Sequence, residues 1–177
     1  TGSWLAQLPG LVRLYVRETV KNVYFLAIVI SGAGFILANS KVVGSIFGTN
    51  TYPVTYQVID FASGTFALFV IVVTAFYAGE LTWRERDARM ALIADSYPTP
   101  TWLGFTAKLV TLFGVQALLQ CVVLVCGVLI QLASGYAKIE LAQHLALLFA
   151  LQLPDDWMLA AFALAILTGV FIGGYNL

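Results

Sequence analysis

The 177-residue chain is 60% hydrophobic and only 10% charged, whereas an average soluble domain is about 45–50% apolar and about 25% charged. Nine basic and nine acidic residues give a net charge of zero, which argues against an extended nucleic-acid-binding surface. The composition also excludes a soluble enzyme and a disordered chain, because disorder needs few apolar residues and a high net charge. The sequence therefore predicts a membrane protein.

The first segment of the chain is amphipathic. Arg13, Arg17 and Lys21 recur every four residues and form one basic stripe, while apolar side chains fall largely on another face. A helix of this kind lies in the membrane interface, with its bases near anionic lipid headgroups. We therefore predict an interfacial helix over residues 1–21.

Four apolar stretches follow. A bilayer core of about 30 Å is crossed by roughly 20 apolar helical residues. The first stretch, Val23 to Ala38, is short, and either extends to Asn22 and Asn39 at its ends or thins the bilayer locally. The fold class predicted is all-α: a polytopic membrane helix bundle with about four spans, over residues 22–39, 61–78, 109–133 and 158–175.

The basic residues orient these spans. Seven Lys and Arg side chains precede the first span or lie between the second and third, whereas only Lys41 and Lys138 fall on the opposite side. Because cytoplasmic loops carry the excess of Lys and Arg, we expect the N-terminus and the loop over residues 79–101 to be cytoplasmic.

Residues 139–153 are apolar apart from four polar side chains. Fifteen residues reach only about 22 Å as a helix, which is too short to span. We predict an external interfacial or re-entrant helix here, with His144 as an interfacial polar residue. Asp155 or Asp156 then caps the fourth span; a pair of catalytic acids is the less favoured alternative.

Polar side chains inside the spans have two interpretations. Gln116 and Gln120 lie one turn apart in the third span, and amides in lipid need hydrogen-bond partners. They either bond a neighbouring helix or line a polar pathway. Asp60, at the outer edge of the second span, either caps that helix or joins the same pathway.

Sequence motifs for catalysis are absent from these residues. There is no G-x-x-x-x-G-K-[ST] phosphate loop and no H-E-x-x-H motif, and a single histidine cannot form a multi-histidine zinc site. We therefore expect no catalytic, metal or cofactor site in this segment.

The cytoplasmic loop is the most informative stretch. Residues 80–95 contain no Gly or Pro, and their charges recur at helical spacing, which predicts a helix that continues beyond the membrane. The residues alone leave open whether this helix is solvated or contacts a partner.

The segment from Phe76 to Arg89, followed by Pro98-Thr99-Pro100 and Lys108, resembles the loop after the second span of type-2 ABC exporter permeases. In that family a Glu closes the second span, a charged helix follows and a Lys begins the third. Residues 21–25, 51–56 and 151–155 resemble a narrower group, the bacterial permeases fused to a gluzincin-type aminopeptidase. The resemblance covers residues 11–160.

The resemblance implies roles for two segments. Residues 1–21 would be the elbow helix, and the 79–101 loop would hold the coupling helix that docks on a separate nucleotide-binding subunit, where ATP and Mg²⁺ bind. The docking residues implied are Glu80, Arg84, Glu85, Arg86, Arg89 and Met90.

The function implied is that of a permease subunit of an ATP-driven exporter in the bacterial inner membrane, paired with a second permease half as a dimer or pseudo-dimer. Such permeases have six spans per half, so residues 1–177 are expected to be a partial transmembrane domain, with any zinc aminopeptidase domain outside it. The alternative is a non-transporting membrane anchor or scaffold for a fused or associated peptidase. A membrane-embedded enzyme is disfavoured by the shortage of acids and bases within the spans.

Overall fold

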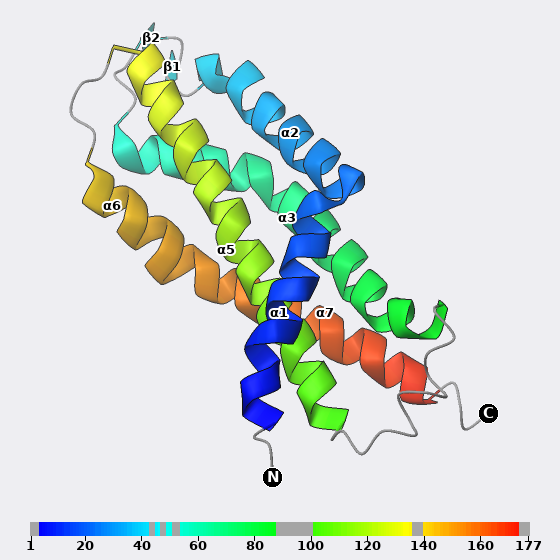
Figure 1. Ribbon diagram of the computed structural model, residues 1–177. Coiled ribbons are helices and arrows are strands. Elements are labelled where there is room, and N and C mark those ends of the chain that lie inside the picture. Colours follow the sequence, from blue (N-terminus) through cyan, green and yellow to red (C-terminus); the bar gives the residue numbers. More distant parts are fainter. Residues whose placement is uncertain are drawn as a thin grey trace.

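The computed structural model describes residues 4–42, 45–46, 49–50, 54–87, 101–135 and 140–173. Over these residues the chain is an all-α helix bundle (Figure 1). Its α-helices are α1 (Trp4–Lys21), α2 (Val23–Ala38), α3 (Thr55–Asp87), α5 (Thr101–Ala133), α6 (Leu141–Leu145) and α7 (Leu153–Gly173).

Short elements connect α2 to α3. A 3₁₀ turn, η1 (Ser40–Val42), follows α2. The two-residue strands β1 (Ser45–Ile46) and β2 (Thr49–Asn50) then pair antiparallel, with Ser45 opposite Asn50 and Ile46 opposite Thr49. Both strands lie at the end of the bundle where α2 and α5 end (Figure 1).

Three stretches among the described residues are long and apolar enough to cross a membrane: Thr55–Thr82, Trp102–Ala133 and Leu141–Val170. A fourth is added if α1 and α2, which meet at a bend of 63°, form one broken span. The protein is thus a multi-pass membrane protein. Figure 1 shows that α1 and α5 begin, and α3 and α7 end, at the same end of the bundle.

Two asparagines define the ends of α2. The Asn22 side chain accepts a hydrogen bond of 3.0 Å from the Tyr24 N–H, and the Asn39 amide donates one of 2.9 Å to the Phe35 carbonyl. The Asn22 bond satisfies an N–H that lacks a partner within the helix, whereas the Phe35 carbonyl also accepts from the Asn39 backbone N–H at 3.2 Å. Helix α2 therefore begins after Asn22 and ends before Asn39. Helix α1 packs along α5.

α3 begins earlier than the apolar pattern predicts. The N–H groups of Gln57 and Val58 donate to the Val54 carbonyl at 3.1 and 3.2 Å, so the helix starts at Thr55 rather than at residue 61. Asp60 consequently lies inside the helix, and its predicted capping role is wrong. α5 likewise starts before residue 109, at Thr101. Each helix has 33 residues, about 50 Å, which exceeds a bilayer core of about 30 Å.

The largest difference from the sequence prediction concerns residues 139–175. Instead of an external helix and a separate span, α6 continues through a π-helical segment, η2 (Ala146–Gln152), into α7. The Leu153 N–H donates to the Leu148 carbonyl, five residues earlier. Pro154 has no N–H and would break an ordinary α-helical bond at this point, and π segments accommodate such interruptions.

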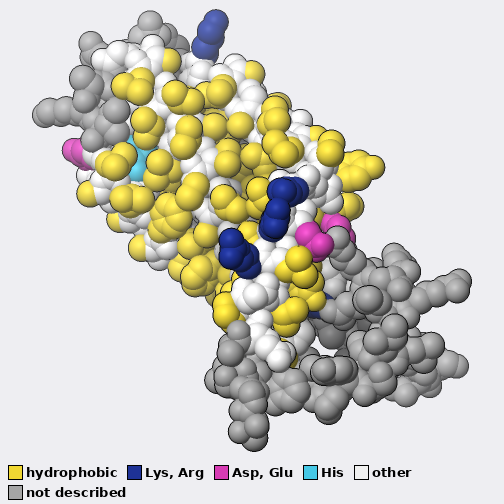
Figure 2. Space-filling model, in the orientation of Figure 1, with side chains coloured by type: hydrophobic (Ala, Val, Ile, Leu, Met, Phe, Trp, Pro, Cys, Tyr) yellow, Lys and Arg dark blue, Asp and Glu magenta, His cyan; other side chains and the backbone are white. Residues whose placement is uncertain are grey.

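α3 packs against α2, α5 and α7 and forms the centre of the bundle. Its side chains Phe66 and Tyr77 are almost fully buried, as is Leu119 of α5. The outside is also apolar: in Figure 2 hydrophobic side chains cover most of the described surface, and basic side chains are few. An apolar interior within an apolar exterior is the arrangement expected in a lipid solvent.

Candidate functional site

Three glutamines of α5 place amide groups inside the bundle. Gln116, Gln120 and Gln131 are each at most 2% exposed. Each amide nitrogen donates to a different neighbour: Gln116 to the Thr74 hydroxyl, Gln120 to an Asp156 carboxylate oxygen at 2.5 Å, and Gln131 to the Thr55 hydroxyl at 3.1 Å. The amides therefore tie α5 to α3 at two levels and to α7 at a third.

The direction of the Gln116–Thr74 bond follows from the neighbouring group. The Thr74 hydroxyl donates its hydrogen to the Val70 carbonyl at 2.6 Å. Its oxygen is then free to accept from the Gln116 amide nitrogen, which fixes the amide orientation. Both side chains are buried, so this pair is a fully enclosed link between α3 and α5.

The Gln120–Asp156 pair lies deep in the spanning region. Asp156 falls at the middle of the continuous stretch Leu141–Val170, so its predicted capping role is wrong. Helix α7 is further held to α5 by Trp157, whose ring stacks on that of Phe113 with centroids 4.9 Å apart. The Trp157 indole nitrogen also donates to the Phe113 carbonyl at 3.3 Å. An acidic side chain is thus fixed on the inner side of α7.

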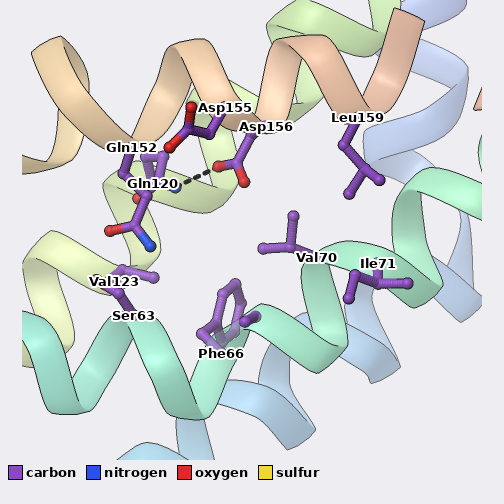
Figure 3. Close-up of a pocket in the computed structure, with 11 residues that line it drawn as sticks. Ser63, Phe66, Val70, Ile71, Gln120, Val123, Gln152, Asp155, Asp156 and Leu159 are labelled. Atoms are coloured by element: carbon purple, nitrogen blue, oxygen red, sulfur yellow. Dashed lines mark hydrogen bonds between the residues drawn. The ribbon is translucent and has the colours of Figure 1, made fainter. Parts of the chain in front are cut away.

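A cavity of about 220 Å³ lies beside this pair, between α3, α5 and α7. In Figure 3, Asp156 points from α7 toward α3, which provides the opposite wall, while Asp155 lies alongside α7, and a dashed line joins Gln120 to Asp156. The lining residues are Ser63, Phe66, Ala67, Val70, Ile71, Gln120, Val123, Gln152, Asp155, Asp156 and Leu159.

Two buried polar atoms in this lining have no hydrogen-bond partner among the described residues: the Ser63 hydroxyl and the Gln120 amide oxygen. Buried polar groups are nearly always satisfied, so each exception needs an explanation. The only feature of the sequence that indicates this cavity is the position of Asp155 and Asp156 near the centre of a long apolar stretch. This pair is instead interpreted from the sequence as the start of a span. Nothing in the sequence around Ser63 indicates that it lines a cavity.

The predicted pathway residues are brought together only in part. Gln120 lines the cavity, whereas Gln116 lies one helical turn away and bonds α3. Asp60 is exposed on α3, one turn before Ser63. Both glutamines thus have partners on neighbouring helices, and the pathway role stays a prediction.

The predicted docking residues lie at the far end of α3. Glu80 is half-buried within the helix, and one of its carboxylate oxygens has no hydrogen-bond partner among the described residues. The helical backbone continues through Arg84, Glu85 and Arg86 to Asp87. The last two predicted docking residues, Arg89 and Met90, lie outside the described residues.

His144, predicted to be an interfacial polar residue, lies inside the bundle near the start of the stretch Leu141–Val170. It is fully buried, its Nδ1 lies 3.2 Å from the Glu140 carbonyl, and its ring faces Gly127 of α5. Over the described part of the chain, no three His, Cys, Asp or Glu side chains gather closely enough to hold a metal ion.

Comparison with known proteins adds no assignment: no family model, curated protein or solved structure matches this chain.

Proposed function

We propose that this chain is a transmembrane permease subunit of an ATP-driven ABC exporter. The observation that carries the proposal is that α3 runs without a break from the spanning stretch Thr55–Thr82 to Asp87, and so includes residues 80–87 of the charged segment that resembles a coupling helix. The same helix supplies Ser63 and Phe66 to the cavity wall. One continuous helix therefore connects the proposed docking segment to the interior of the bundle.

In this proposal ATP and Mg²⁺ bind the partner ATPase, and hydrolysis moves the docking segment. Because an α-helix transmits displacement along its axis, movement at Arg84 and Arg86 reaches the part of α3 that lines the cavity. A second permease half completes the membrane pathway. The proposed location is the bacterial inner membrane, with the N-terminus and the 79–101 loop in the cytoplasm.

The docking role is tested by reversing two charges. The variant Arg84→Glu/Arg86→Glu in the full polypeptide is expected to lose the co-purifying ATPase, or to lose stimulation of ATP hydrolysis at least about tenfold, because opposite charges become like charges at the contact. Retained ATPase and association, assayed in detergent and in lipid nanodiscs, would contradict the assignment.

The matched control is Arg13→Glu/Arg17→Glu, which reverses two charges on α1 and leaves α3 unchanged. We expect this control to keep the ATPase. If no ATPase with a phosphate-binding loop accompanies even the unaltered chain, the permease proposal fails and the anchor or scaffold alternative takes its place.

The orientation is tested with single cysteines in a background where Cys121 and Cys126 are replaced by serine. A membrane-impermeant maleimide added to intact cells or spheroplasts is expected to label Lys41→Cys, whereas Lys21→Cys is labelled only after permeabilisation. The positive-inside bias gives this expectation. The opposite labelling pattern would reverse the orientation.

A further inference from the structure

The cavity between α3, α5 and α7 is lined by acidic and neutral polar side chains but by no basic side chain among the described residues. Its lining includes two carboxylates, two amides and one hydroxyl, and no Lys, Arg or His is among the described residues that line it. The α7 sequence has no basic residue, and α3 has none before Arg84. The one base of α5, Lys108, lies twelve residues before Gln120, about 18 Å along the helix.

An acidic pair in this position needs compensation. Asp155 is exposed and Asp156 half-buried, and both lie near the middle of the stretch Leu141–Val170. Carboxylates at the depth of a bilayer centre are costly unless they face a polar partner or cavity. The Gln120 amide supplies one hydrogen bond to Asp156 and no charge, and no basic side chain lines the cavity among the described residues.

Ser63 provides independent evidence that points to a ligand. Several other helical hydroxyls, those of Thr74, Thr82 and Thr111 among them, donate to the carbonyl four residues earlier. Ser63 is 7% exposed, and its hydroxyl has no such partner. It lines the cavity together with Gln120, whose amide oxygen is unpartnered among the described residues, as are those of Gln116 and Gln131 outside the cavity.

We propose that this cavity binds a small organic cation, a primary ammonium group carrying a short apolar chain. The three N–H donors of an ammonium match three acceptors at the cavity: the Asp156 carboxylate, the Gln120 amide oxygen and the Ser63 hydroxyl oxygen. The apolar walls formed by Phe66, Val70 and Leu159 accommodate the chain. A metal ion fits less well, because no group of three acidic or sulfur or imidazole ligands gathers among the described residues.

As a site for the transported molecule, this inference rests on the proposed function. As a binding site it is measured without ATP or a partner, so the two proposals fail separately. Loss of ATPase association leaves the cavity measurement unaffected, and absence of binding leaves the docking result unaffected.

The test is calorimetric titration of n-butylammonium into the full polypeptide in nanodiscs of zwitterionic lipid, with n-butanol as the uncharged counterpart. We expect saturable binding of the ammonium and none of the alcohol. Asp156→Asn keeps an acceptor for Gln120 and removes the charge, and is expected to weaken binding at least about tenfold. Glu140→Gln makes the same chemical change at an exposed site outside the cavity and is expected to leave binding within about twofold.

Ser63→Ala is a second, smaller change that keeps the proposal falsifiable if Asp156→Asn fails to fold. It removes one acceptor from the cavity wall and is expected to weaken binding several-fold. The proposal is overturned if n-butylammonium does not bind, if n-butanol binds equally well, or if the folded variants at Asp156 and Ser63 bind like the unaltered chain.

Discussion

Replacing Gly32 by alanine is expected to destabilise the bundle by about 1–3 kcal/mol, the usual range for overpacking a tight core. A Cβ at Gly32 would lie 2.5 Å from Cε2 of Phe66 and 3.1 Å from Cγ of Phe69. Phe66 is 1% exposed at the centre of the bundle, so its ring has little room to move. The measurement is thermal unfolding of the purified chain in detergent.

Gly34 provides the matched control on the same helix. Nothing lies within 4 Å of a Cβ added there, and exchanging a helical glycine for alanine is favourable by about 0.5–1 kcal/mol. Gly34→Ala is therefore expected to leave the melting temperature unchanged or raise it. Equal shifts in the two variants would show that α2 does not approach α3 through Gly32.

The second large effect is expected at Thr74. Thr74→Val keeps the shape of the side chain but leaves the buried Gln116 amide without its acceptor, which costs about 1–3 kcal/mol in protein interiors. Interhelical hydrogen bonds in membranes give somewhat smaller values, about 0.6 on average and about 1.7 at most. We therefore expect a loss of about 1 kcal/mol in the free energy of unfolding, measured by thermal unfolding in detergent.

Two further variants make this prediction specific. Thr111→Val removes a buried hydroxyl that likewise donates to a carbonyl four residues earlier, and is expected to cost less because no amide bonds it among the described contacts. Adding Gln116→Leu to Thr74→Val is expected to recover most of the loss, since the stranded amide is gone. A double variant as unstable as Thr74→Val alone would contradict the pairing.

The general architecture can be predicted from the sequence, because apolar stretches long enough to cross a bilayer indicate membrane-spanning helices. The ends of α2 are readable too, since asparagines at 22 and 39 cap helix ends by local hydrogen bonds. The start of α3 cannot be predicted in this way, because polar residues such as Thr55 and Gln57 are typical of loops and Thr55 finds its hydrogen-bond partner only in the folded bundle. Thr55, for example, accepts a hydrogen bond from Gln131, 76 residues away in the sequence.

The misplacement of the Asp155-Asp156 pair has a related cause. Pro154 before two acidic residues is typical of a helix start, and this pattern suggested a cap. The π-helical segment before Pro154 absorbs the interruption instead, and the pair lies within one long helix. The local sequence pattern therefore predicts a capping role for residues that tertiary packing places beside a cavity.

The cavity lies between two hydrogen bonds that join α3 to α5. Thr55 is bonded by Gln131 and Thr74 by Gln116, and these threonines are nineteen residues apart, about 28 Å along the helix axis. Ser63 and Phe66 lie between them. The two bonds therefore lie on either side of the cavity-lining part of α3, and loss of either one removes a polar contact between α3 and α5 on one side of the cavity while the other contact remains.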